Sequence, residues 1–141
     1  MIKVDAEVVI GRPLAEVFAF VTDLRNDARW WTSVIRSTRS HGSGGVGSRY
    51  QVDARLLGVR DTWEIEVTAQ DPPRRQTIVG RGSLPYTCHY DFTAHATGTR
   101  FLMTAEIAPS GPWRLLGPLF RPVIRAVMRH HMRRLDRILT G

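Results

Sequence analysis

PWRLLGPLFRPVIRAVMRHHMRRLDRIL, residues 112–139, is the stretch that decides the fold of this chain. Its apolar side chains recur at steps of three and four, which places them along one stripe of a helix. Pro118 and Pro122 predict that the regular helix begins near Pro122, after a looser first part. No other stretch is long enough to be a main helix, so one long C-terminal helix should pack against the rest of the chain. The stripe consists of Leu116, Phe120, Val123, Ile124, Val127, Leu135 and Ile138.

Arginine side chains occupy most of the other directions of this helix, and the whole chain has 20 basic against 13 acidic residues. A net charge of +7 can attract nucleic acid or an anionic membrane surface. A charge run on a helix is more often its solvated face, so we expect no nucleic-acid partner. A membrane-surface role is the weaker alternative, because the core needs the apolar stripe.

The length and composition are those of one domain, residues 1–141, with 43% hydrophobic residues. No run of about 18 apolar residues exists, so we expect no integral membrane segment. Charges inside the N-terminal MIKVDAEVVIG indicate a first strand and not a signal peptide, which makes a cytoplasmic location the default. One cysteine, Cys88, excludes an internal disulfide and a Cys-based zinc cluster. We expect no metal and no cofactor, and a monomer or homodimer.

The stretch before the long helix alternates apolar and polar residues, as half-buried strands do. Pro13 suits a first helical position and predicts a short helix to about Thr22. Asp23 can cap a second short helix through about Ala28. Short turns between the later strands imply antiparallel neighbours, and the grouping of strands implies an α+β fold. Strands are expected at 2–10, 34–40, 48–58, 59–70, 76–83, 86–96 and 100–108.

This order of elements resembles the START-like or helix-grip superfamily, also called SRPBCC, the polyketide cyclase/dehydrase and lipid transport group. The resemblance rests on VDAEVVIGRPLAEVFAFVTDLRNDARWW, GVGSRY, WEIEVTAQDPPRR, GTRFLMTAEI and the closing helix, and it covers nearly the whole chain. It implies a curved antiparallel sheet of six to seven strands wrapped around the C-terminal helix, with two short helices after the first strand. Members bind hydrophobic ligands, carry lipids, cyclise polyketides or act with chaperones. The superfamily has no universal catalytic motif, so the fold implies only a class of function.

Gly42, Gly44 and Gly47 match the letters of a dinucleotide-binding loop. Such a loop needs a strand before it and a helix after it, so that the pyrophosphate meets the helix N-terminus. The residues that follow alternate as a strand. The glycines therefore predict a hairpin turn and not a nucleotide site.

Aromatic side chains are the candidate lining of a pocket between the sheet and the helix, because ligand pockets are mainly apolar with few polar groups. Trp30 and Trp31 are adjacent, so one of them can form an aromatic wall while the other plugs the core. The tyrosine hydroxyls could orient a ligand or reach a backbone partner. Cys88 is better explained as a small buried residue than as a nucleophile. The candidate ligand-binding residues are Trp30, Trp31, Tyr50, Trp63, Tyr86, Tyr90, Phe92 and Val127.

Asp61 and His131 are the candidate catalytic residues. Asp61 shares a strand face with Trp63, and it is either a general base of raised pKa or a solvated or arginine-paired carboxylate. His131 lies on the inner stripe of the helix, where it is either an acid/base or a satisfied core histidine. Adjacent His130 points elsewhere, so the pair is not a metal site.

Two functions remain open. The first is a module that binds a hydrophobic or aromatic small molecule, lipid- or polyketide-like, without changing it. The alternative is a polyketide cyclase or dehydratase that acts in the same pocket by general acid/base catalysis. The second requires Asp61 and His131 to converge within hydrogen-bond reach of one point.

Overall fold

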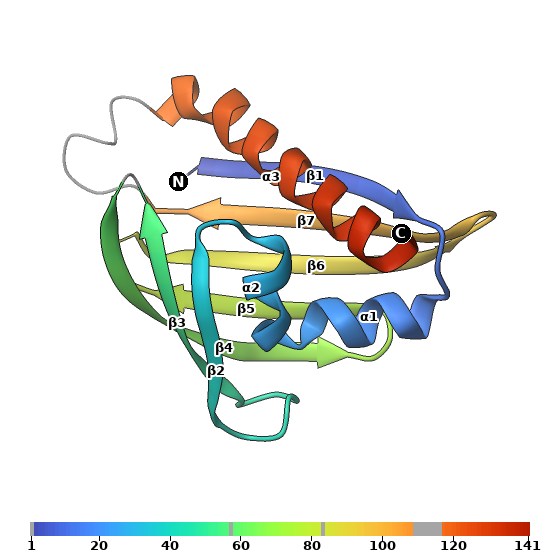
Figure 1. The fold of residues 1–141 in the computed structure, drawn as a ribbon, viewed down its shortest axis with the longest axis horizontal. Coiled ribbons are helices and arrows are strands. Elements are labelled where there is room, and N and C mark those ends of the chain that lie inside the picture. Colours follow the sequence, from blue (N-terminus) through green and yellow to red (C-terminus); the bar gives the residue numbers. More distant parts are fainter. Residues whose placement is uncertain (1, 57, 83, 109–116) are drawn as a thin grey trace.

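A computed structural model describes residues 2–56, 58–82, 84–108 and 117–141 of the chain (Figure 1). Seven strands form a single curved antiparallel sheet, with two short helices after the first strand and one long helix at the end. The strands are β1 (Ile2–Ile10), β2 (Val34–His41), β3 (Arg49–Leu56), β4 (Val59–Asp71), β5 (Arg75–Arg81), β6 (Tyr86–His95) and β7 (Gly98–Ile107). The helices are α1 (Leu14–Thr22), the 3-10 helix η1 (Leu24–Asn26), α2 (Asp27–Trp30) and α3 (Gly117–Thr140).

The strand order in the sheet is β1-β7-β6-β5-β4-β3-β2. Strands β2 to β7 follow one another along the chain as antiparallel neighbours, and β1 closes the order by pairing with β7. The helix α3 packs along β1, while α1 and α2 lie nearer the middle of the sheet (Figure 1). This arrangement confirms the helix-grip architecture expected from the sequence.

The first strand shows how directly alternation in the sequence becomes burial in the fold. Ile2, Val4, Ala6 and Ile10 are buried, and the residues between them are exposed or half-buried. The buried faces of β6 and β7 continue this interior under α3.

The short helices differ slightly from the prediction of one helix capped at Asp23. Asp23 does cap a helix, since its carboxylate accepts a hydrogen bond from the backbone N–H of Arg25, but that helix is the single 3-10 turn η1. The chain then continues as α2 from Asp27 to Trp30, two residues beyond the predicted end.

The start predicted for the long helix, near Pro122, was wrong, because α3 already begins at Gly117 and contains Pro122. A proline inside a helix lacks the N–H that would bond four residues back, here to Pro118 in the first turn. So near the N-terminus the helix loses one hydrogen bond and continues. Residues 112–116 of the predicted stretch lie outside the described residues.

The glycine-rich loop 42–48 connects two antiparallel strands, β2 and β3. Gly42, Gly44 and Gly47 all have positive φ angles, which glycine adopts without steric cost. The hydroxyl of Ser48 accepts a hydrogen bond from the N–H of Gly44 within this loop. A strand, β3, follows the loop, and not the helix that a dinucleotide-binding loop needs. The predicted hairpin turn is therefore confirmed.

The interior under α3 has two unlike halves. Towards α1, Phe92 stacks on Phe101 with ring centroids 4.9 Å apart, and Phe18 meets Phe92 edge-on at 5.3 Å. Met132 and Leu135 of α3 are also fully buried. This half is closed by its own side chains. Among the described residues, no helix is long and apolar enough to cross a membrane.

Candidate functional site

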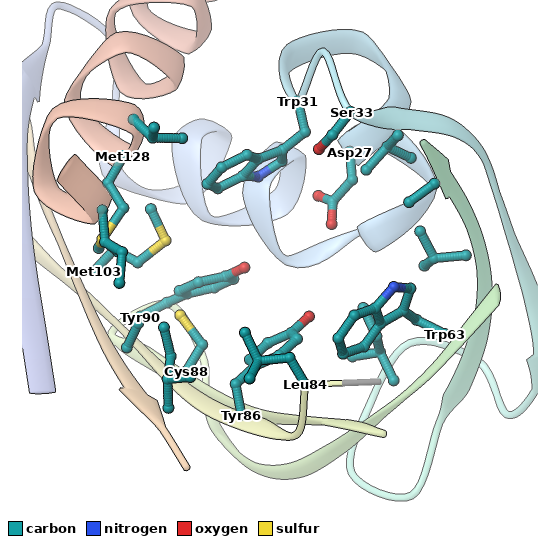
Figure 2. Close-up of a pocket in the computed structure, with 18 of the residues that line it drawn as sticks. Asp27, Trp31, Ser33, Trp63, Leu84, Tyr86, Cys88, Tyr90, Met103 and Met128 are labelled. Carbon is teal, nitrogen blue, oxygen red and sulfur yellow. The ribbon is translucent and has the colours of Figure 1, made fainter. Parts of the chain in front are cut away.

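A cavity of about 360 Å³ lies between the sheet and the N-terminal half of α3 (Figure 2). Its volume falls in the range of small-molecule sites, and its walls are mostly apolar. Leu84, Val123 and Val127 line it while being 37%, 57% and 46% exposed, so they mark its mouth. The described lining residues are Asp27, Trp31, Ser33, Val34, Val52, Ala54, Trp63, Ile65, Leu84, Tyr86, Cys88, Tyr90, Met103, Ala105, Ile107, Val123, Ile124, Val127 and Met128.

Small residues on β6 and β7 create the space. Cys88 stands directly opposite Ala105 in the strand register, and both face the cavity. Further along the same two strands, Phe92 stands opposite Phe101 and the interior is filled. The change from a small pair to an aromatic pair therefore sets the inner end of the cavity.

Two aromatic rings form part of the sheet wall, and two glycines give them room. Trp63 and Tyr86 pack against each other with ring centroids 5.8 Å apart. A Cβ atom added at Gly80 would collide with the Tyr86 ring, and one added at Gly82 would collide with the Trp63 ring. Each ring lies directly over a glycine, which has no side chain, so the ring can pack close to the sheet backbone and takes up less of the cavity.

Trp31 forms the wall opposite the sheet, and His131 holds it from behind. The imidazole stacks on the indole with ring centroids 4.5 Å apart and planes 23° apart. Nδ1 of His131 donates to the carbonyl of Val127 at 2.8 Å, because a carbonyl can only accept. Nε2 is then the acceptor for the hydroxyl of Thr32 at 2.9 Å. Both ring nitrogens are thus engaged, and the residue is 6% exposed.

Asp27 brings a carboxyl group to this apolar cavity, although the residue is only 6% exposed. Its Oδ1 has no hydrogen-bond partner among the described residues. Burial raises the pKa of Asp27 well above its usual value, and the negative charge of Asp23 raises it further. The neighbouring Trp30 indole opposes this with a smaller lowering of the pKa.

The phenol groups of Tyr86 and Tyr90 and the thiol of Cys88 keep their protons more firmly than usual. Burial is the main cause that raises the pKa of Tyr86, Cys88 and Tyr90. A thiol with a raised pKa carries little thiolate, which argues against Cys88 as a nucleophile. In Figure 2 the hydroxyls of Tyr86 and Tyr90 point towards the space that the Asp27 carboxyl faces.

The structure brings five of the eight candidate ligand-binding residues to the cavity. Three others, Trp30, Tyr50 and Phe92, are buried in the core and are not among its lining. Alternation identified the correct strand face for Tyr50 and Phe92, but it does not say how far along the strand the cavity extends. Trp30 packs behind Trp31, with ring centroids 4.9 Å apart. The five lining residues are Trp31, Trp63, Tyr86, Tyr90 and Val127.

The two candidate catalytic residues are not among the residues that line the cavity. Asp61 is half-buried near the start of β4, where its carboxylate accepts from the N–H of Thr62 at 2.9 Å. His131 lies behind Trp31. The titratable lining residue that sequence reasoning missed is Asp27, the first residue of α2, four positions before Trp31.

Within the described ranges, no group of three or more His, Cys, Asp or Glu side chains is placed to hold a metal ion.

Comparison with known proteins identifies the family. The family model described as polyketide cyclase / dehydrase and lipid transport matches residues 1–140. The chain belongs to this family. No curated protein sequence matches significantly.

Solved structures agree with the family in fold. A START superfamily protein from Mycobacterium smegmatis superposes with a TM-score of 0.81 at 12% identity, over 99% of this chain and 97% of that one. A protein from Thermus thermophilus superposes with a TM-score of 0.76 at 21% identity, over 96% of this chain and 94% of that one. A protein from Chromobacterium violaceum superposes with a TM-score of 0.76 at 13% identity, over 99% of this chain and 98% of that one. At these identities the likeness concerns the fold, so the ligand must be inferred from this chain's own residues.

Proposed function

We propose that this protein binds a hydrophobic or aromatic small molecule, lipid- or polyketide-like, in the cavity between the sheet and α3. The observation that carries the proposal is the cavity of about 360 Å³, with mainly apolar walls and an exposed mouth formed by Leu84, Val123 and Val127. A fold that only needed stability would fill this space, as Phe92 and Phe101 fill the other half.

Native mass spectrometry of freshly purified protein, compared with its denatured mass, tests the proposal first. A species released on denaturation supports an occupied site, and its mass narrows the ligand class. A thermal-shift panel of fatty acids and flat aromatics is the second test. A ligand at a hundred times its Kd adds about 2.7 kcal/mol, or on the order of 10 °C in Tm. If nothing co-purifies and no compound shifts Tm, the proposal is wrong.

A cavity-filling variant makes the test specific to this site. Ala105→Phe adds a ring where Ala105 faces the cavity beside Cys88, so we expect ligand binding to be abolished. Ala126→Phe adds the same ring on the exposed side of α3 and is the matched control. If both variants lose ligand binding equally, or if neither loses it, the ligand binds elsewhere.

A cyclase or dehydratase activity in the same cavity is the second candidate. It is favoured by family membership and by the group of Asp27, Tyr86 and Tyr90 around one space. General acid/base catalysis needs a titratable group in direct or one-water contact with the reacting atom. To decide between catalysis and binding, the co-purified compound is incubated with the wild type and with Asp27→Asn and then analysed by mass spectrometry. Conversion by the wild type alone supports an enzyme, and an unchanged compound supports binding.

A further inference from the structure

The Asp27 carboxyl is a polar group inside an apolar wall, and one of its oxygens is unsatisfied. Oδ1 of Asp27 has no hydrogen-bond partner among the described residues, and neither has Nε1 of the neighbouring Trp30. Asp27 is 6% exposed. Figure 2 shows the carboxyl directed into the cavity from α2. A buried polar atom without a partner is costly to a fold, so such atoms usually have a reason to exist. A hydrogen bond kept for the ligand is one such reason.

The surroundings of Asp27 favour its neutral form. Among the described residues, the charged side chain that acts on it most is Asp23, which is itself negative. Burial and this repulsion both raise the pKa of Asp27. A carboxyl held neutral at ordinary pH carries an O–H and can donate a hydrogen bond.

Two further O–H groups face the same space from the opposite wall. Tyr86 and Tyr90 line the cavity from β6, and their hydroxyls point towards the Asp27 side in Figure 2. Burial raises the pKa of both phenols, so both keep their protons. The Tyr90 hydroxyl already interacts with the Cys88 thiol, so the Tyr86 hydroxyl is the donor that the sheet wall offers opposite Asp27.

We propose that Asp27 is the specificity-determining residue of this site, and that its carboxyl O–H donates a hydrogen bond to a carbonyl-type oxygen of a neutral, otherwise apolar ligand. The inference rests on the proposed function, because it assumes that the cavity takes a small molecule. It goes beyond that function by naming the one polar feature that the ligand must carry.

Charged ligands fit the site less well. No Lys or Arg is among the described lining residues, so an anionic head group would be buried without a counter-charge. A neutral amine could take the Asp27 proton and form an ion pair. Its protonated form would have to approach a chain of net charge +7. A neutral acceptor meets neither obstacle.

Three probes of nearly equal shape test the inference: acetylnaphthalene, isopropylnaphthalene and naphthylethylamine. Their Kd values are measured by isothermal titration calorimetry on the wild type, Asp27→Asn and Asp27→Leu. A neutral hydrogen bond of ordinary strength corresponds to roughly 3- to 10-fold in Kd, so we expect the wild type to bind the ketone tighter than the hydrocarbon by that factor. Asp27→Asn keeps an N–H donor and retains this preference. Asp27→Leu loses it while still binding the hydrocarbon.

The other outcomes separate the two proposals. Equal binding of ketone and hydrocarbon by the wild type would overturn the role of Asp27 and leave the proposed function intact. If the wild type binds the amine tightest and both variants lose this preference, Asp27 is an ionised carboxylate. This result would also overturn the proposed role of Asp27. Binding of none of the three probes would count against both. Because the wild-type ratio and Asp27→Asn are informative by themselves, a poorly folded Leu variant would not prevent a decision.

Discussion

The imidazole of His131 lies against the indole of Trp31, with ring centroids 4.5 Å apart, and this contact joins the core of α3 to the wall of the cavity. The imidazole is fixed by the Val127 carbonyl and the Thr32 hydroxyl. His131 therefore fixes the position of Trp31 in the cavity wall.

Protonation of His131 should weaken the fold. Burial lowers the pKa of His131 below its usual 6.5, the bond to Val127 opposes this, and the charges of His130 and Arg134 add to the lowering. Between the folded and unfolded pKa values the unfolded state binds more protons, so stability falls as pH drops below about 6.5 and then levels off. His131→Phe keeps a stacking ring without titrating. We expect its urea-unfolding free energy to lack this decline, measured from pH 8 to pH 5.

The matched control is His130→Phe, which removes an exposed histidine next to the stacked one. It should keep most of the decline. An identical pH profile in wild type and His131→Phe would show that His131 has the same pKa in the folded and unfolded states. That result would contradict an effect of its burial on the pKa.

Gly80→Ala should reduce the cavity from the sheet side. The new Cβ would collide with the Tyr86 ring, which lines the cavity, so we expect the ring to move into it. Overpacking of this kind destabilises by about 1–3 kcal/mol, and ligand binding should weaken together with stability. Tm and probe affinity are both measured.

The double variant Gly80→Ala with Tyr86→Ala distinguishes this explanation from a simple backbone effect. If the collision is with the ring, removing the ring makes the added methyl nearly harmless. Equal damage from Gly80→Ala in the presence and absence of the Tyr86 ring would contradict the proposed contact.

Most of the fold could be predicted because its determinants are local. Alternation in β1 identified the buried face, and the spacing in α3 placed the buried Leu135 on the predicted stripe. The rest of that stripe was only partly right, because Val123 and Val127 are exposed, whereas the buried Met128 and Met132 were not assigned to it. The prediction that the helix starts near Pro122 failed because a proline near a helix end removes one hydrogen bond, and the helix runs through it.

The site could be predicted only in part, because its depth is a long-range property. Strand periodicity gives Tyr86, Tyr90 and Phe92 the same face. Only the register that pairs Phe92 with Phe101 shows that the first two face the cavity and the third closes it. Asp27 was missed because its burial depends on α2 being pressed onto the cavity, which a polar residue in a short helix does not indicate.

Gln76 should prove to be a structural residue despite its polar side chain. It is fully buried, its Nε2 donates to the Thr22 carbonyl at 3.3 Å, and its Oε1 accepts from Gln70 at 2.6 Å. Gln76→Leu leaves those partners unsatisfied, so we expect a loss of about 1–3 kcal/mol in unfolding free energy. Gln51→Leu, on the exposed face of β3, is the control and should change stability by less than about 0.5 kcal/mol.

Asp27→Asn should stabilise the empty protein, and more at neutral than at acidic pH. The groups that interact with Asp27 are Asp23 and the Trp30 indole, together with Tyr86, Cys88 and Tyr90 across the cavity. Because the pKa of Asp27 is raised above 3.8, the folded state holds a proton that the unfolded state has released, and stability falls as pH rises above that value.

The slope of this loss cannot exceed about 1.4 kcal/mol per pH unit, and Asn, which never ionises, removes it. Urea unfolding of wild type and Asp27→Asn at pH 4, 5.5 and 7 therefore gives a difference that grows with pH. Asp23→Asn is the control, since it removes a partly exposed carboxylate whose pKa is lowered mainly by its hydrogen bond to Arg25. That variant should lose stability at neutral pH instead of gaining it. A difference between wild type and Asp27→Asn that is constant across this range would mean that Asp27 is not held neutral, and the anchor proposed for the ligand would lose its donor.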